Sequence, residues 1–193
     1  MAPRLAPFLL AAASLLAAAP ASAFERQWHA GGGLGVVGLK HGDFSGAAIG
    51  AELDLTYGLS DMFNALVEVS YSPHVLSGQV AGPPDEKGNP GPAVDVKLPG
   101  TYTSFTSVAG IAYTLDVLRW IPYAGVLAGT SFFRGPLASD VRFDWALALG
   151  LDYQATRSLS LGLALRWHDA PSKRNPDTTQ FQGWLRAAYT WGY

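Results

Sequence analysis

The segment Ala47–Tyr57, AAIGAELDLTY, alternates between two kinds of side chain. Its odd-numbered positions carry Ala, Ile, Ala, Leu, Leu and Tyr, whereas its even-numbered positions carry Ala, Gly, Glu, Asp and Thr. A period of two residues is the signature of a β-strand whose two faces meet different surroundings. The segment therefore predicts a strand with one apolar face and one face of small and polar side chains.

The same alternation recurs along the chain, and turn-forming residues separate its occurrences. The segment Trp28–Leu39 is rich in Gly, and the segment Trp120–Phe133 is apolar at both odd and even positions. The inward and outward faces of these two segments therefore stay unassigned. Bacterial single-chain transmembrane barrels have an even number of strands, and the chain offers eight: Trp28–Leu39, Ala47–Tyr57, Phe63–Tyr71, Thr101–Leu115, Trp120–Phe133, Arg142–Tyr153, Ser158–His168 and Phe181–Tyr193.

The composition favours a membrane environment. Asp, Glu, Lys and Arg make up 15% of the chain and apolar residues make up 49%, whereas soluble domains carry about 25% charged residues. Beyond the first residues, no run of about 18 apolar residues is present that would form a membrane helix. The formal net charge of −2 gives no indication of a nucleic-acid partner, and the lack of cysteine excludes disulfides and thiolate metal sites.

The beginning of the chain has the pattern of a secretory signal peptide. Arg4 supplies a positive charge, Leu5–Ala19 is apolar, and Ala21–Ala23 is a small-x-small cleavage site. An N-terminal membrane anchor is the alternative, but the run is short and ends in a processing site. We expect a signal peptide over residues 1–23, cleavage between Ala23 and Phe24, and one barrel domain over residues 24–193.

Two water-soluble folds also have alternating strands, a lipocalin-like barrel and a β-sandwich. A water-exposed face should carry about 25–35% charged residues, but here the polar face is mostly Gly, Ala, Ser and Thr. The apolar face carries aromatic residues near strand ends, as the interfacial girdles of membrane barrels do. The predicted fold is therefore an all-β, eight-stranded antiparallel up-and-down transmembrane β-barrel. The girdle residues are Trp28, Tyr57, Tyr71, Trp145, Tyr153, Trp167, Tyr189 and Trp191.

Most connections between strands alternate between short and long, which is the rule for membrane barrels with short periplasmic turns and longer outer loops. The first hairpin, near KHGD, is the exception, because it is short on the side of the long loops. The longest connection, Pro73–Gly100, is rich in Pro and Gly, and its PDEKGNPG stretch is expected to be a mobile loop. Long loops are where surface function is expected.

The polar face predicts a lumen that contains charged groups. In a barrel this narrow the side chains fill the interior, so its charges must pair or hold water. We expect a structural ion-pair network, in which one carboxylate bridges Arg166 and Arg186 on adjacent strands. A proton or ion path, or a buried acid/base site, is the alternative. The lumen residues are Glu52, Asp54, Glu68, Asp144, Asp152, Arg166, His168 and Arg186.

Taken together, these features resemble the small outer-membrane β-barrel family that includes the membrane domain of OmpA and OmpX. The resemblance implies insertion into the outer membrane of a Gram-negative bacterium by the barrel assembly machinery, in contact with lipid and lipopolysaccharide. That machinery recognises a last strand that ends in aromatic residues, and AAYTWGY matches with Tyr189, Trp191 and Tyr193.

The sequence favours a structural or surface-interaction role, with an unidentified extracellular ligand and no cofactor, metal or catalytic site. A lipid A-modifying enzyme is one alternative, because RWHDAPSKRN faintly resembles the penultimate-strand region of outer-membrane lipid A deacylases. His168 is followed two residues later by Ala170 instead of Ser, and the alternation predicts that His168 points inward, away from lipid. Ser172 lies in the loop beyond and Asp169 is nearby, but nothing in the sequence places the three together as a catalytic site requires. A narrow or gated channel is a further alternative, although large aqueous pores need about sixteen strands.

Overall fold

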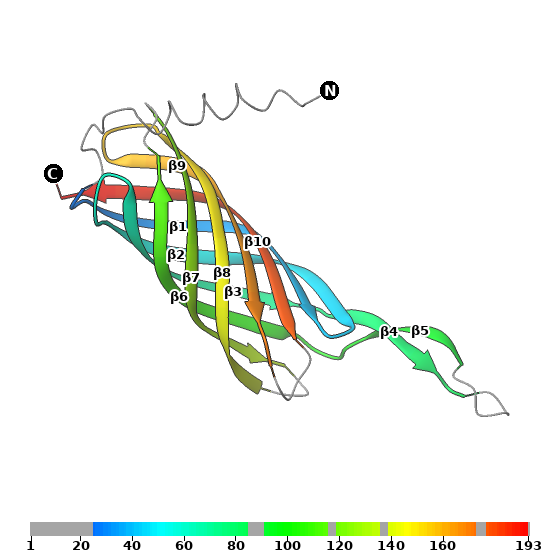
Figure 1. Cartoon of the computed structure of the whole chain (residues 1–193). Coiled ribbons are helices and arrows are strands. Elements are labelled where there is room, and N and C mark those ends of the chain that lie inside the picture. The colour runs from blue at the N-terminus through cyan, green and yellow to red at the C-terminus, as the bar shows by residue number, and fades with distance from the viewer. Residues whose placement is uncertain (1–24, 85–90, 116–118, 136–138, 173–176, 193) are drawn as a thin grey trace, which may run out of the picture.

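The structure is a computed structural model that describes residues 25–84, 91–115, 119–135, 139–172 and 177–192. Within these ranges every regular element is a β-strand (Figure 1). Ala23, Phe24, Tyr193 and most of the PDEKGNPG stretch lie outside the described residues. The strands are β1 (Trp28–His41), β2 (Phe44–Gly58), β3 (Phe63–His74), β4 (Ser77–Gly82), β5 (Gly91–Lys97), β6 (Tyr102–Thr114), β7 (Trp120–Arg134), β8 (Ser139–Gln154), β9 (Leu159–Ala170) and β10 (Thr178–Trp191).

Eight of these strands close into a barrel. Around the barrel the order is β1, β10, β9, β8, β7, β6, β3 and β2, and every neighbouring pair is antiparallel. Closure depends on β1, which pairs with β10 from Trp28 to His41 and with β2 over the same residues. The predicted eight-stranded antiparallel barrel is therefore confirmed.

The two further strands, β4 and β5, were not predicted. They form a hairpin inside the Pro73–Gly100 connection, with a register shift between Ala81 and Gly82. Among the described residues, the hairpin pairs with the barrel sheet where Phe44 and Ser45 of β2 lie opposite Gly78 and Ser77. Figure 1 shows it projecting beyond the barrel strands, at the end away from the C-terminus. We call this the hairpin end and the opposite end, where Trp28 and Trp191 pair, the terminal end.

The distribution of side chains is the reverse of that in a water-soluble barrel. Large apolar side chains lie exposed on the outer surface, among them Ile49 at 75% and Leu185 at 70%, while Glu52, Glu68 and Arg166 are buried. A soluble barrel with this outer surface would expose far more contiguous apolar area than water tolerates. Only lipid suits such a surface, which decides against the lipocalin-like alternative.

The alternation also assigns the two strands whose faces the sequence left open. On β1, Leu34 and Val36 face outward, whereas Val37 and Leu39 are buried. On β7, Val126 and Phe132 face outward, and the inward positions include Ile121, Tyr123, Leu127, Ser131 and Phe133. No helix in the described part of the chain is long and apolar enough to cross a membrane.

Aromatic rings on the outer surface gather near the ends of the barrel. At the terminal end, Trp28 lies between Tyr57 and Trp191, with ring centroids 4.6 and 6.4 Å away. Trp120 and Tyr153 add a second pair there, 4.9 Å apart. Rings that are apolar in body and polar at the tip suit the interface between lipid and water. Four of the predicted girdle residues thus meet other rings across neighbouring strands: Trp28, Tyr57, Tyr153 and Trp191.

Glycine on β1 makes room for the largest buried side chain, Trp184 of β10. A Cβ atom placed on Gly35 would fall 2.6 Å from Cε3 of Trp184 and closer still to the carbonyl oxygen of Gly183. On the opposite face of β1, a Cβ on Gly38 would have nothing nearer than 3.7 Å. The absence of a side chain is therefore required at Gly35 and not at Gly38.

We expect Gly35→Val to destabilise the barrel, because overpacking a filled interior typically costs about 1–3 kcal/mol. Urea unfolding in lipid vesicles, together with the fraction of protein that migrates as folded on an unboiled gel, measures this. Gly38→Val is the matched control, since its side chain points into lipid. Equal stability of the two variants would contradict the packing argument.

Candidate functional site

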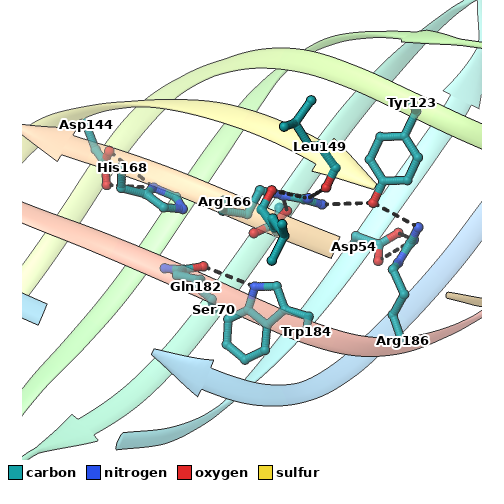
Figure 2. Close-up of polar contacts among 12 residues, drawn as sticks. Asp54, Ser70, Tyr123, Asp144, Leu149, Arg166, His168, Gln182, Trp184 and Arg186 are labelled. Carbon is teal, nitrogen blue, oxygen red and sulfur yellow. Dashed lines mark hydrogen bonds and ion pairs between the residues drawn. The ribbon is translucent and has the colours of Figure 1, made fainter. Parts of the chain in front are cut away.

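The middle of the lumen is crossed by a buried ion pair between opposite walls of the barrel. Arg166 on β9 donates from Nε to Oε2 of Glu68 on β3 at 2.8 Å, and each side chain is 1% exposed. Arg166 also donates from Nη1 to the carbonyl oxygens of Leu149 and Leu165 at 3.3 and 3.2 Å. Figure 2 shows this guanidinium held from several sides. Buried charges persist only when they are paired in this way.

A second arginine organises the lumen closer to the terminal end. Arg186 on β10 donates from Nη2 to both carboxylate oxygens of Asp54, each at 2.7 Å. Its Nη1 donates to Oδ2 of Asp152 on β8, also at 2.7 Å. Asp54 on β2 and Asp152 on β8 lie on opposite sides of the barrel. Arg186 therefore connects β2, β8 and β10 across the interior.

Tyr123 on β7 connects the two arginines, which corrects the prediction of a bridging carboxylate. Both Arg166 and Arg186 donate to its hydroxyl oxygen at 3.4 Å, and both guanidinium carbons lie within 5.8 Å of the centre of its ring. Among the described residues, no carboxylate pairs with both arginines. Sequence reasoning missed Tyr123 because the apolar character of β7 hid which of its residues face inward.

A separate polar cluster lies toward the hairpin end of the lumen. Asp144 on β8 lies 3.3 Å from Nδ1 of His168 on β9 and accepts a hydrogen bond from Ser131. Ser131 in turn is 2.8 Å from the hydroxyl of Thr106. Beside this cluster, Trp184 donates from its ring nitrogen to Gln182 at 3.2 Å (Figure 2). All of these groups are buried.

Apolar side chains close the lumen between this cluster and the hairpin end. We call the buried group of Leu39, Leu76, Phe133 and Ala170 the hydrophobic plug. Phe44, Leu98 and Tyr102 pack against it from the hairpin side. Arg142 beside the plug pairs with Asp140 at 2.8 Å and donates to Thr178 at 2.8 Å. The hairpin end therefore has both an apolar and an ionic closure.

A small cavity lies inside the described barrel. A cavity of about 50 Å³ lies at the terminal end, bounded on its inner side by Tyr123, Arg166 and Arg186. Asn64 Oδ1 and Asp152 Oδ1, both on lining residues, are buried without a hydrogen-bond partner. Since one water needs about 10–15 Å³ in such a cavity, the volume suits a few waters and not a lipid or a sugar.

All eight lumen residues named from the sequence lie on the inner face, but they do not form one network. Arg166 with Glu68 and Arg186 with Asp54 and Asp152 form the central ion-pair layer. His168 and Asp144 belong to the cluster at the hairpin end. Glu52 is buried among them, and neither of its carboxylate oxygens has a hydrogen-bond partner among the described residues.

A family comparison fits this architecture. The model of the outer membrane protein beta-barrel domain matches residues 8–185. The chain belongs to this family. The protein is therefore an outer-membrane β-barrel. In such barrels short turns face the periplasm and long connections face outward.

Solved structures show the same fold at low sequence identity. The barrel is similar to OprG from Pseudomonas aeruginosa, with a TM-score of 0.63, 14% identity, and coverage of 89% of this chain and 99% of OprG. For neisserial surface protein A the TM-score is 0.59 and the identity is 10%, with coverage of 86% of this chain and 97% of that protein. For Ail of Yersinia pestis the TM-score is 0.51 and the identity is 13%, with coverage of 87% of this chain and 100% of Ail. A search of curated proteins found no match.

The residues of the deacylase hypothesis are not assembled in this outer-membrane barrel. His168 points into the lumen and contacts Asp144, whereas Asp169, the next residue on the strand, lies on the opposite face. The backbone N–H of Ser172 donates to Asp177 beyond the end of the strand. The three residues therefore do not form a Ser–His–Asp arrangement on one surface.

The ion pair between Arg166 and Glu68 should contribute strongly to stability. We expect Arg166→Met and Glu68→Gln each to lower the free energy of unfolding by about 3–5 kcal/mol, because each leaves a buried charge without its partner. The double variant should lose less than the sum of the two. Urea unfolding in vesicles measures all three, with the exposed Arg134→Met as the control. Unchanged stability of Arg166→Met would show that the pair is not structural.

Proposed function

We propose that this outer-membrane barrel is a closed membrane anchor that displays the β4–β5 hairpin for contact with another protein outside the cell. The observation that carries the proposal is the combination of a filled lumen with a hairpin that continues beyond the barrel. A channel would need an open lumen, and an enzyme would need an assembled reactive site. The contacts described above favour neither alternative.

The filled lumen argues for an anchor. The hydrophobic plug, the Asp144–His168 cluster and the ion-pair layer follow one another along the barrel axis. An ion crossing the barrel would have to displace apolar side chains and then separate buried charge pairs. Eight strands leave an interior just wide enough for side chains, so we expect no alternative path beside these groups in the described part of the barrel.

The hairpin has features of a protein-binding element. Val80 and Val94 lie opposite each other on one face and are 39% and 46% exposed. On the other face Gln79 donates to Asp95 at 3.0 Å. Strand β5 is the last strand in the sheet order, so its outer edge has no neighbouring strand among the described residues.

An open strand edge beside an exposed apolar face suits one kind of partner in particular. An extended polypeptide segment that adds a strand to β5 would satisfy the free backbone groups and cover the valines. Pro92, Asp95 and Lys97 on this edge limit indiscriminate pairing, since proline and charged side chains protect exposed edges from aggregation. The proposed partner is therefore an extended segment of a surface-exposed or extracellular protein.

Removing the hairpin should abolish surface contact without harming the barrel. The N–H of Leu98 donates to the carbonyl of Leu76 at 2.9 Å, so a short Gly-Ser turn can replace residues 77–97 and leave both leucines in place. We expect normal insertion of this variant but reduced attachment of producing cells to surfaces coated with extracellular-matrix protein.

The control for that experiment carries a Gly-Ser replacement of similar kind in the Ala155–Ser158 turn at the terminal end. Because the chain lacks cysteine, Val94→Cys also reports display through labelling of intact cells by an impermeant maleimide. Equal attachment of the hairpin-less and wild-type proteins would contradict the proposed contact role.

The closed lumen gives a second expectation. Purified barrel incorporated in planar bilayers should produce no discrete conductance steps, because the plug and the ion-pair layer leave no continuous water path. A known porin in the same bilayers is the positive control. Reproducible single-channel steps from the wild-type protein would favour the channel alternative.

A further inference from the structure

The central layer of the lumen contains more acidic than basic groups. Four buried carboxylates, those of Glu52, Asp54, Glu68 and Asp152, share it with the guanidinium groups of two arginines, Arg166 and Arg186. Arginine stays charged in proteins, so full ionisation of the acids would leave the layer with a net charge of 2 − 4 = −2. Unbalanced charge in a dry interior costs several kcal/mol or more.

Three of the four carboxylates have a stabilising contact. Glu68 accepts from Arg166, while Asp54 and Asp152 accept from Arg186. Asp152 also lines the small cavity at the terminal end, where water can hydrate its second oxygen. One negative charge in excess is thereby placed beside water.

Glu52 has no such contact. Its side chain is 2% exposed, and both of its carboxylate oxygens are buried without a hydrogen-bond partner among the described residues. It packs against Gly33, where an added Cβ would lie 2.9 Å from Oε1, and that part of β1 offers no side-chain donor. The backbone of β1 is paired to β2 and β10 on both sides.

We propose that Glu52 is a proton-binding site of the folded barrel and carries its proton as a neutral carboxylic acid. The charged groups around it are Glu68 on β3, Asp54 on β2, Arg166 on β9 and Arg186 on β10. Both arginines already hold other carboxylates at 2.7–2.8 Å. Of the four acidic charges in this layer, protonation removes the one that accepts no hydrogen bond from either arginine.

A metal ion is the other way to offset this charge, and the geometry does not support it. Hard cations take about six or more oxygen ligands, several of them carboxylates. In the described part of the chain, no three acidic or histidine side chains converge so as to hold a metal ion. A proton needs only the single carboxyl group.

Infrared spectroscopy tests the proposal directly. A protonated carboxylic acid gives a carbonyl stretching band that is distinct from the bands of carboxylates and of backbone amides. We expect this band in the wild-type barrel refolded in phospholipid vesicles at neutral pH, and its loss in Glu52→Gln. Glu25→Gln, at an exposed turn position that contacts Arg26, is the matched control and should keep the band.

Proton uptake during refolding gives an independent readout. In unfolded protein Glu52 is ionised at neutral pH, so the wild-type chain should take up about one proton more on folding than Glu52→Gln does. A pH-indicator dye in weakly buffered vesicles measures this difference. Heat-modifiable migration on a gel verifies that both proteins fold.

Three results would overturn the assignment. The first is a wild-type barrel without the acid band, and the second is a band that persists in Glu52→Gln. The third is failure of Glu52→Gln to fold, because the neutral amide has nearly the shape of the protonated acid and should be tolerated at this position.

Discussion

The constraint on which this structure depends is that a backbone in lipid must satisfy all of its own hydrogen bonds. The pairing of β1 with both β2 and β10 meets it, since it leaves the barrel sheet without an edge. Closure of eight strands also fixes the width of the interior. Once the width is fixed, the choice of inward side chains is a packing problem, and the glycines around Trp184 are part of its solution.

The same closure explains why polar and charged groups lie inside. Apolar side chains are needed outside, against lipid, and the pleat places every second residue in the lumen. These inward groups cannot reach bulk water, so a charged group among them must pair, hold water or give up its charge. Arg166 and Arg186 pair with carboxylates from β2, β3 and β8, and the pairs hold together strands that are not neighbours in the sheet.

The sequence predicts the barrel well because its evidence is local. Alternation, low charge and terminal aromatics each report on a single strand, and together they yield the strand number and the two faces. The contacts inside the lumen depend instead on which strands face one another and at what height. For that reason Tyr123 was missed, because it lies on a strand whose two faces are both apolar in sequence. For the same reason the prediction of a carboxylate that bridges the two arginines was wrong. Strands β4 and β5 were missed because GPAVDVK, with its glycine and proline, reads as a loop.

A filled lumen also determines where function can reside. Inward side chains that are buried and paired with one another are not free to bind a ligand, and the outer wall faces lipid. What remains accessible is the surface beyond the membrane. There the longest connection, between β3 and β6, contains the β4–β5 hairpin with its open edge. The β4–β5 hairpin pairs with β2 at only two residue pairs. We therefore expect that the hairpin can vary or be replaced without disturbing closure of the barrel. With the proposed contact role, stability and recognition are located in different parts of the same sheet.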